Sequence, residues 1–263
     1  MIRYVLRDGS QSEDPSLDRL PSQNMNRLSR FPFAASDAAR ELEDVPLKTK
    51  MHRRGVLLDQ DPDPALNYDG NGCVSFSNLA FMRSFPIRNR TIKVELGNVP
   101  IEKPGAIVLY HHFQDIDEWP ETHAGGEGGT SVDAAGKYLT EIGVYSEYHW
   151  VTNGAWELAR VLQKQPAIMG TWWWSGSDEA DVRPDGLALP TGRKRGGHAW
   201  EVDGVAVDVT HFGVHYDLLF RGQQTWGRWG WQKSGTFWIP GPAMDTYLMD
   251  QGECMVPTEV AQS

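Results

Sequence analysis

Hydrophobic residues in the first half of the chain recur at the spacing of one helix face. Within the segment 73–85 they include Val74, Phe76, Leu79, Ala80 and Met82. Steps of three and four residues place side chains on one side of an α-helix, so the pattern predicts a helix that opens at or near Cys73. The same spacing predicts helices over 104–115, 131–143 and 155–165 and a short helix over 36–44. Ser131 is a suitable N-cap, and Pro166 ends the helix before it.

The second half consists of short runs of β-branched and aromatic residues, separated by Gly, Asp and Pro. These runs predict strands over 167–174, 198–210, 216–220 and 236–240. Helices followed by strands indicate an α+β protein with segregated lobes.

The length of the chain, 263 residues, allows one large domain or two interlocked lobes around a shared cleft. Residues 1–45 lack a sustained apolar period, and we expect a partly ordered arm there. We expect the folded domain over 46–258, with a helical lobe over about 46–150 and a β lobe over about 151–258.

The formal net charge is -10, which excludes nucleic acid and anionic membrane as the main partners because an acidic surface repels phosphate groups. The compact basic run Arg193–Arg195 is interpreted as a solvated loop. No apolar stretch approaches the roughly 18 to 20 residues that span a bilayer. The first residues also lack the apolar core of a secretory signal, so no export by that route is expected.

Cys73 follows a glycine-containing turn and opens the predicted helix. Unpaired backbone N–H groups and the helix dipole at such a position favour the thiolate, and the same groups can donate to a developing oxyanion. A buried, inert cysteine is the alternative for either Cys73 or Cys254, the two cysteines of the chain. We expect Cys254 to be a free thiol without a role in chemistry.

A candidate base and a candidate third group lie in the second half. His198 follows Gly196-Gly197 and is predicted to open an alternating strand, with Trp200 and Val202 on its face. Gln224 precedes a loop rich in Trp and Gly, where a polar side chain could hold the histidine and shield the bond from water. Both segments could instead be purely structural, but a helix-opening cysteine and a histidine in separate halves suit nucleophilic catalysis.

Taken together, Cys73, then GGHAW (196–200), then QTWGRWG (224–230) followed by GTFWIP (235–240) resemble the papain-like family of cysteine peptidases. The matching family signatures are a Gln upstream of a cysteine-opened helix, GHA at a strand start, and an Asn before a Ser-Trp-Gly loop. Other segments, such as EGGTSVDAAGKYL (127–139), resemble papain-like proteins of actinobacteria and their bacteriophages more narrowly. The similarity runs from about residue 50 to 258.

The resemblance implies a two-lobed fold, with a helical lobe, a β-barrel-like lobe and the active-site cleft between them. It also implies a role for each matching position. Cys73 would be the nucleophile and His198 the base, with the Cys73 N–H and a side-chain amide forming the oxyanion hole. Asn67 has the family's spacing for that amide, but the sequence context favours Gln60, with a seven-residue insertion after it. Gln224 stands where the family has Asn, which predicts a weaker orientation of His198.

The resemblance also places Gly128, Gly129 and Thr130 along the wall of the substrate-binding cleft, with Gly197 and Trp226 nearby. No metal or organic cofactor is expected. Three possible metal ligands, His211, His215 and Asp208, lack a tight motif, so a metal site there is disfavoured. The group His111, His112, Asp115, Asp117 and Glu118 is interpreted as a solvated helix face.

The predicted function is cysteine-dependent hydrolysis of a peptide or isopeptide bond in a peptide or protein substrate. The first alternative is a papain-like fold kept as a structural or binding component, for example of a bacteriophage particle or another protein assembly. The second is a transpeptidase or other amide-bond enzyme with the same Cys73 and His198. The expected location is cytoplasmic or virion-associated.

Overall fold

The computed structural model describes residues 45–54, 57–66, 68, 70–84, 86, 91–94, 97–118 and 128–257. Before residue 45 it describes residues 4–5, 11–12, 32–33, 39 and 42. Ala39 and Leu42 are helical, and the rest of the helix predicted over 36–44 lies outside the described residues. The same is true of most of the predicted arm over 1–45.

The four longer predicted helices are confirmed. They are α2 (Cys73–Arg83), α3 (Lys103–Ile116), α4 (Val132–Glu141) and α5 (Gly154–Val161). Ser131 caps α4 as predicted, because its hydroxyl accepts a hydrogen bond from the Ala134 N–H at 3.1 Å. Two further α-helices, α6 (Ser175–Asp178) and α7 (Gly241–Met249), were not predicted. Helix α7 begins with Gly-Pro, which suggests a turn in sequence, although proline suits a first helical turn.

A seven-stranded antiparallel sheet contains all four predicted strands. Its order is β10 (Thr236–Pro240), β9 (Val214–Gln223), β8 (Lys194–His211), β7 (Ala167–Trp174), β11 (Glu253–Pro257) and β6 (Tyr148–Trp150), and β3 (Lys50–Met51) also pairs with β8. The α+β class is confirmed; the sheet is open and forms no closed barrel within the described residues, so the term barrel-like describes the β lobe only loosely. Two small hairpins complete the described strands, namely β1 (Tyr4–Val5) with β2 (Gln11–Ser12) and β4 (Thr91–Val94) with β5 (Gly97–Pro100).

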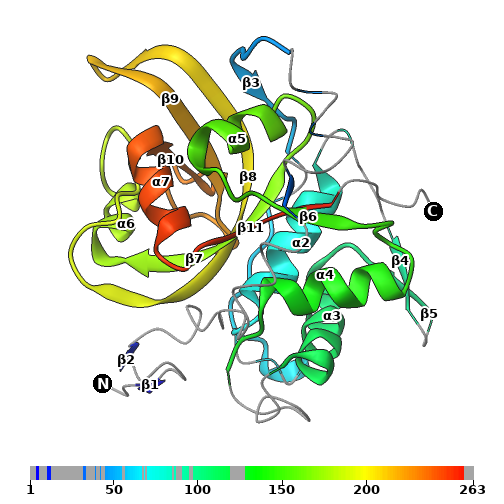
Figure 1. Ribbon diagram of the computed structural model, residues 1–263. Helices are drawn as coiled ribbons and strands as arrows, with labels where there is room; N and C mark the ends of the chain where they lie inside the picture. Colours follow the sequence, from blue (N-terminus) through cyan, green and yellow to red (C-terminus); the bar gives the residue numbers. More distant parts are fainter. Residues whose placement is uncertain are drawn as a thin grey trace.

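The large sheet separates two hydrophobic cores. Helices α2, α3 and α4 cover one face, and α5 and α7 lie against the other (Figure 1). Neighbouring residues of one strand divide between the two cores, since Ala199 belongs to the first and Trp200 to the second.

Strand β8 begins at Lys194, four residues before His198, so the prediction that His198 opens the strand is wrong.

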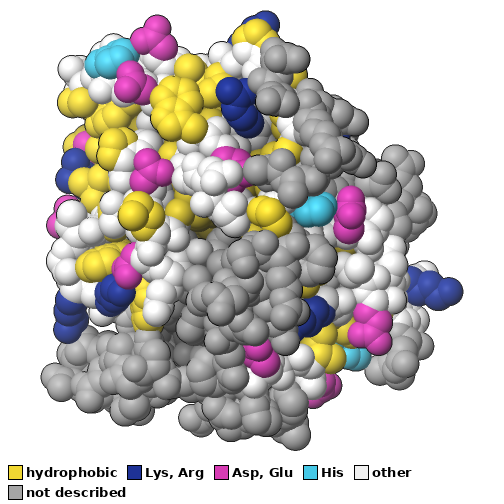
Figure 2. Space-filling model, viewed as in Figure 1, with side chains coloured by type: hydrophobic (Ala, Val, Ile, Leu, Met, Phe, Trp, Pro, Cys, Tyr) yellow, Lys and Arg dark blue, Asp and Glu magenta, His cyan; other side chains and the backbone are white. Residues whose placement is uncertain are grey.

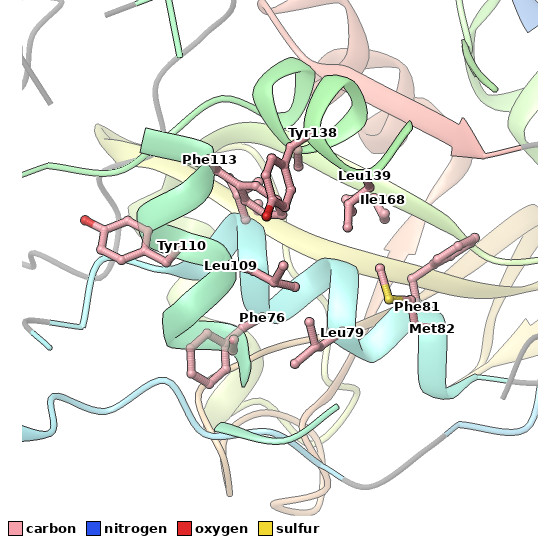
Figure 3. Close-up of a cluster of buried hydrophobic side chains, with 14 of the residues drawn as sticks. Phe76, Leu79, Phe81, Met82, Leu109, Tyr110, Phe113, Tyr138, Leu139 and Ile168 are labelled. Atoms are coloured by element: carbon pink, nitrogen blue, oxygen red, sulfur yellow. The ribbon is translucent and has the colours of Figure 1, made fainter. Parts of the chain in front are cut away.

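Helix α2 is the centre of the first core, and every residue from Cys73 to Met82 is buried. Its apolar side chains pack against those of α3, α4 and β7 (Figure 3). Its polar side chains are satisfied locally, since Ser77 donates to the Val74 carbonyl at 2.9 Å and Asn78 to the same oxygen at 2.8 Å. Internal hydrogen bonds of this kind allow a helix with polar residues to be buried on all sides.

Acidic and basic side chains are interspersed over the described part of the face shown in Figure 2. The basic run is no loop, because Lys194 and Arg195 begin β8 and make ion pairs with Asp250 and Asp178. Among the described helices, none has the length and apolar character to cross a membrane.

A group of charged residues is buried where β8 meets β9. Asp203 accepts from Arg221 Nε at 2.6 Å and lies 3.4 Å from Arg54 Nε. Glu201 is fully buried, and burial raises the pKa of its carboxyl, followed by the negative charge of Asp203, with Arg54 and Arg221 offsetting part of the effect. Glu201 consequently keeps its proton at a pH where the unfolded chain has lost it.

This raised pKa gives the fold a definite pH dependence. Because the native state holds a proton that the unfolded state releases, the free energy of unfolding falls by about 1.4 kcal/mol per pH unit between the ordinary and the raised pKa. Glu201→Gln mimics the protonated acid, so the variant should lose less stability than wild type between pH 5 and pH 9. Urea unfolding across that range measures the difference, and parallel curves for the two proteins would show that Glu201 is ionised in the fold.

Candidate active site

Cys73 is the first residue of α2 and has no exposed surface (0%). The preceding residue, Gly72, donates its N–H to Tyr68 Oη at 2.9 Å. A Cβ atom on Gly72 would lie 2.7 Å from that oxygen, so a side chain at this position would displace the Tyr68 hydroxyl. The first N–H groups of a helix have no partner within it, and Cys73 lies among them.

His198 and Gln224 form a buried hydrogen bond. His198 Nε2 bonds Gln224 Oε1, and neither residue has any exposed surface (0%). The Gln224 oxygen can only accept, so Nε2 carries the hydrogen and Nδ1 holds the lone pair of the neutral ring. The longer Gln side chain therefore reaches the imidazole, although the resemblance predicted a weaker orientation of His198 by a Gln at this position.

Two tryptophans enclose this pair. The Trp226 ring stacks on the His198 ring, with centroids 4.5 Å apart and an angle of 29° between the planes. The Trp173 ring lies edge-on at 5.4 Å and is fixed by a hydrogen bond from its Nε1 to Asp178 at 2.8 Å. The aromatic rings keep water from the His198–Gln224 bond, and a hydrogen bond is stronger in such a low-dielectric surrounding.

Gln60 connects the turn before Cys73 to Thr225, the neighbour of Gln224. Its Nε2 donates to the Gly70 carbonyl at 3.0 Å, three residues before Cys73. Its Oε1 accepts from the hydroxyl of Thr225, the residue after Gln224, and its backbone N–H donates to the Thr225 carbonyl at 2.8 Å. The other candidate amide, Asn67, lies outside the described residues.

These contacts connect Gln60, Gln224, His198 and Trp226 of the predicted site. Hydrogen bonds connect Gln60 to the residue beside Gln224 and Gln224 to His198, while α2 packs directly on β8, the strand of His198. Gly197 is buried in β8, opposite Trp172 of β7. Thr225 was not singled out in the sequence, and nothing local marks it, because its partner Gln60 is 165 residues away in the chain.

Gly128, Gly129 and Thr130 precede α4, and residues of α3 hold them. Tyr110 Oη and Gln114 Nε2 donate to the Gly128 carbonyl at 2.7 and 3.0 Å. These two α3 residues were not singled out either, although their spacing of four places them on one helix face.

The burial of Asp117 contradicts the prediction of a solvated helix face, which included His111, His112, Asp115, Asp117 and Glu118. Asp115 is exposed as expected, but Asp117 is buried and accepts hydrogen bonds from Thr130 and Ser131. Burial is possible because Thr130 and Ser131 supply hydrogen-bond donors to the carboxylate. The spacing in the sequence did not connect their segment to α3.

The three disfavoured metal ligands do not converge on one point. His211 Nε2 bonds the Asp185 carbonyl at 2.8 Å, and His215 lies 3.6 Å from Asp208. Within the described residues, no group of three or more His, Cys, Asp or Glu side chains could hold a metal ion.

The fold is similar to that of solved cysteine proteases. Xylellain, a cysteine protease from Xylella fastidiosa, superposes with a TM-score of 0.62 at 15% identity, over 94% of this chain and 97% of that one. Digestive procathepsin L 3 of Tenebrio molitor larval midgut gives 0.55 at 16% identity, over 92% and 76%. The bromelain protease from Ananas comosus, in complex with the E64 inhibitor, gives 0.51 at 13% identity, over 78% and 94%.

At these identities the likeness concerns the fold, and the papain-like fold is confirmed. No protein-family model matches the sequence, and no curated protein matches it either. The narrower resemblance to actinobacterial and bacteriophage proteins stays a prediction.

The second cysteine, Cys254 of β11, is buried on the far side of the sheet from α2. Burial raises the pKa of its thiol well above the ordinary value, and the charge of Glu157 adds to the effect. A thiol in that state is a poor nucleophile.

Cys254 should therefore not react with iodoacetamide at neutral pH while the protein is folded. In Cys73→Ala, we expect alkylation at pH 7.5 to be at least about tenfold slower than in the same protein unfolded in urea. Mass spectrometry of the intact protein measures both rates. Rapid native labelling of Cys73→Ala would show that the Cys254 thiol is accessible and ionisable.

Proposed function

We propose that this chain is a cysteine-dependent hydrolase of peptide or isopeptide bonds, with Cys73 as nucleophile and His198 as general base. The observation that supports it best is the buried His198–Gln224 pair under Trp226, joined through Thr225 and Gln60 to the turn before Cys73. We propose 46–258 as the catalytic domain, with a helical lobe to about 150 and a β lobe beyond it.

The position of Cys73 suits a nucleophile. At the head of α2, the helix dipole and the backbone N–H groups of the first turn favour a negative charge on the sulfur. A cysteine with a purely structural role does not need to lie at the N-terminus of a helix. Cys254, by comparison, lies within the strand β11.

His198 is prepared to accept the thiol proton. Gln224 Oε1 holds the hydrogen on Nε2, so Nδ1 is the basic nitrogen and takes the proton when the thiolate attacks the substrate carbonyl carbon. The imidazolium that forms keeps its bond to Gln224, and the stacked Trp226 ring keeps that bond dry. His198 then protonates the leaving amine and later activates the water that hydrolyses the thioester.

Gln60 supplies the side-chain part of the oxyanion hole in this proposal. Its amide is oriented by the Thr225 hydroxyl, which occupies Oε1 and so directs Nε2 towards the turn before Cys73. An amide nitrogen carries two hydrogens, one of which goes to the Gly70 carbonyl. The second, together with the Cys73 N–H, would stabilise the negative oxygen of the tetrahedral intermediate.

A peptide or protein is the proposed substrate. We propose that its main chain runs along Gly128–Thr130, with Gly197 and Trp226 on the side of the β lobe, and that no metal or organic cofactor takes part. We also propose no role for nucleic acid or membrane, in keeping with the acidic net charge of -10.

The alternative is a papain-like protein with a structural or binding role, for example in a virion. Two observations favour it: Gln224 stands in place of Asn, and both Cys73 and His198 have 0% exposed surface. A substrate reaches such a site only if neighbouring groups move, whereas a structural component needs no access.

Labelling and turnover separate the two roles. We expect an epoxysuccinyl peptide to label Cys73 in wild type between pH 4 and 9, and His198→Ala to slow the labelling at least about tenfold. Cleavage of a peptide library should fall about a thousandfold or more in Cys73→Ala and in His198→Ala. Cys254→Ala, the matched control, should keep both properties. Labelling of Cys73 no faster than that of a free thiol would favour the structural role.

Gln224→Asn tests whether the site is built around the longer amide. Asn is shorter by one C–C bond of about 1.5 Å, so its oxygen falls short of His198 Nε2 in this backbone. Although the family has Asn here, we expect kcat to fall about tenfold or more in Gln224→Asn and in Gln224→Ala alike. If kcat rises in Gln224→Asn, the longer side chain is a defect of the site.

A further inference from the structure

One face of α3 holds the segment that leads into α4. Tyr110, Gln114 and Asp117 occur at steps of four and three residues, which places them on one side of the helix and its C-terminal end. All three are buried, Asp117 to 4% exposure, although Gln and Asp are usually exposed. A buried polar face on a helix needs partners, and these come from residues 128–131.

The upper part of this face fixes the Gly128 carbonyl. Tyr110 and Gln114 both donate to it, and Gln114 Nε2 also donates to Tyr110 Oη at 3.0 Å, so the three groups form a closed set. Gly128 has a φ of 116°, a backbone conformation that residues other than glycine rarely adopt. The backbone here is held in an unusual conformation by specific bonds.

The lower part fixes the next two residues. Thr130 Oγ1 donates to Asp117 at 2.5 Å, the Ser131 N–H at 2.7 Å and Ser131 Oγ at 3.2 Å. Burial raises the pKa of the Asp117 carboxyl, and the hydrogen bonds from Thr130, Ser131 and the Glu118 backbone lower it in part. Each of these groups is a donor, and an ionised carboxylate can accept from all of them.

The same face also reaches the turn before Cys73. The Tyr110 ring lies edge-on to Tyr68, with centroids 5.9 Å apart at 81°. Tyr68 Oη in turn accepts from the Gly72 N–H. The α3 residues that hold the Gly128 segment therefore pack against the residue that shapes the entry to α2.

We propose that Asp117 is a positioning residue for substrate binding, because its hydrogen bonds fix the path of the main chain from Gly128 to Thr130. The inference rests on the proposed function of Cys73 and His198. The Thr130 hydroxyl is bonded to Asp117 and its side chain is fully buried, while the two residues before it are glycines. The two glycines are buried as well and carry no side chain, so a peptide that reaches this segment meets it through main-chain groups.

The experiment compares Asp117→Asn, Thr130→Val and Thr130→Ser with wild type. Steady-state cleavage of a fluorogenic acyl-tripeptidyl amide gives kcat and KM, and alkylation by iodoacetamide gives the reactivity of Cys73 without a peptide. We expect KM to rise about tenfold in Asp117→Asn and severalfold in Thr130→Val, while the alkylation rate stays within about twofold of wild type. Thr130→Ser keeps the hydroxyl and should keep the wild-type KM.

Asp133→Asn is the matched control. Asp133 is also a buried carboxylate next to this segment, but it bonds Tyr148 Oη at 3.0 Å and Lys137 at 2.6 Å. Its substitution should leave KM unchanged. Thermal unfolding of every variant identifies any that fails to fold, and Thr130→Val tests the proposal if Asp117→Asn does so.

The outcomes separate this inference from the function on which it rests. Turnover by wild type with KM unchanged in Asp117→Asn and Thr130→Val overturns the inference and leaves the hydrolase intact. An equal loss of peptide cleavage and alkylation also overturns it, because Asp117 then supports the whole fold. No turnover and no rapid alkylation by wild type overturns both proposals.

Discussion

Helix α2 is buried on every side, and the arrangement of the rest of the molecule follows from that constraint. Helices α3 and α4 cover it from one direction and the strands β7 and β8 from the other. A helix so enclosed has a fixed position, and so does its first residue, Cys73. The neighbouring turn is also packed closely, because a side chain at Gly72 would displace the Tyr68 hydroxyl.

The His198–Gln224 pair shows how a substitution can keep a geometry. Gln in place of Asn adds a methylene and a torsion, yet the amide oxygen still meets His198 Nε2. The backbone of Gln224 is anchored by its N–H to the Gly235 carbonyl at 2.7 Å, and Trp226 stacks over the ring. Burial and packing freeze the additional torsion, whose entropy would otherwise weaken the bond. The fold and the pair are established by geometry, whereas catalysis remains a proposal about the same atoms.

Buried carboxylates in this protein are stabilised in two different ways. Asp203 faces the guanidinium groups of Arg54 and Arg221, whereas Asp117 is surrounded by hydroxyl and backbone N–H donors. Burial raises the pKa in both cases, since the charged form loses its hydration. A carboxylate bound by several donors of one segment also orders that segment, which is why Asp117 matters for the loop before α4.

The elements of the fold could largely be predicted, because helix and strand periodicity is a local property of the chain. Helix α7 was missed because Gly-Pro suggests a turn, and β8 proved longer than its apolar run because Lys194 and Arg195 are held by ion pairs. Asp117 was misjudged for a similar reason, since a charged residue beside His111 and Asp115 is exposed unless distant donors surround it. Such donors are invisible to a pattern of neighbouring residues.

By itself, the sequence determined that Cys73 opens a helix, that His198 lies in a strand, and that an amide precedes the tryptophan-rich loop. Each of these depends on residues within a few positions of one another. Only the tertiary structure decided that Gln60 bonds Thr225 across 165 residues, that Gln224 reaches His198, and that Asp117 is enclosed. These contacts are set by the packing of α2 and α3 against the sheet and its loops, and packing between distant segments depends on the whole chain at once.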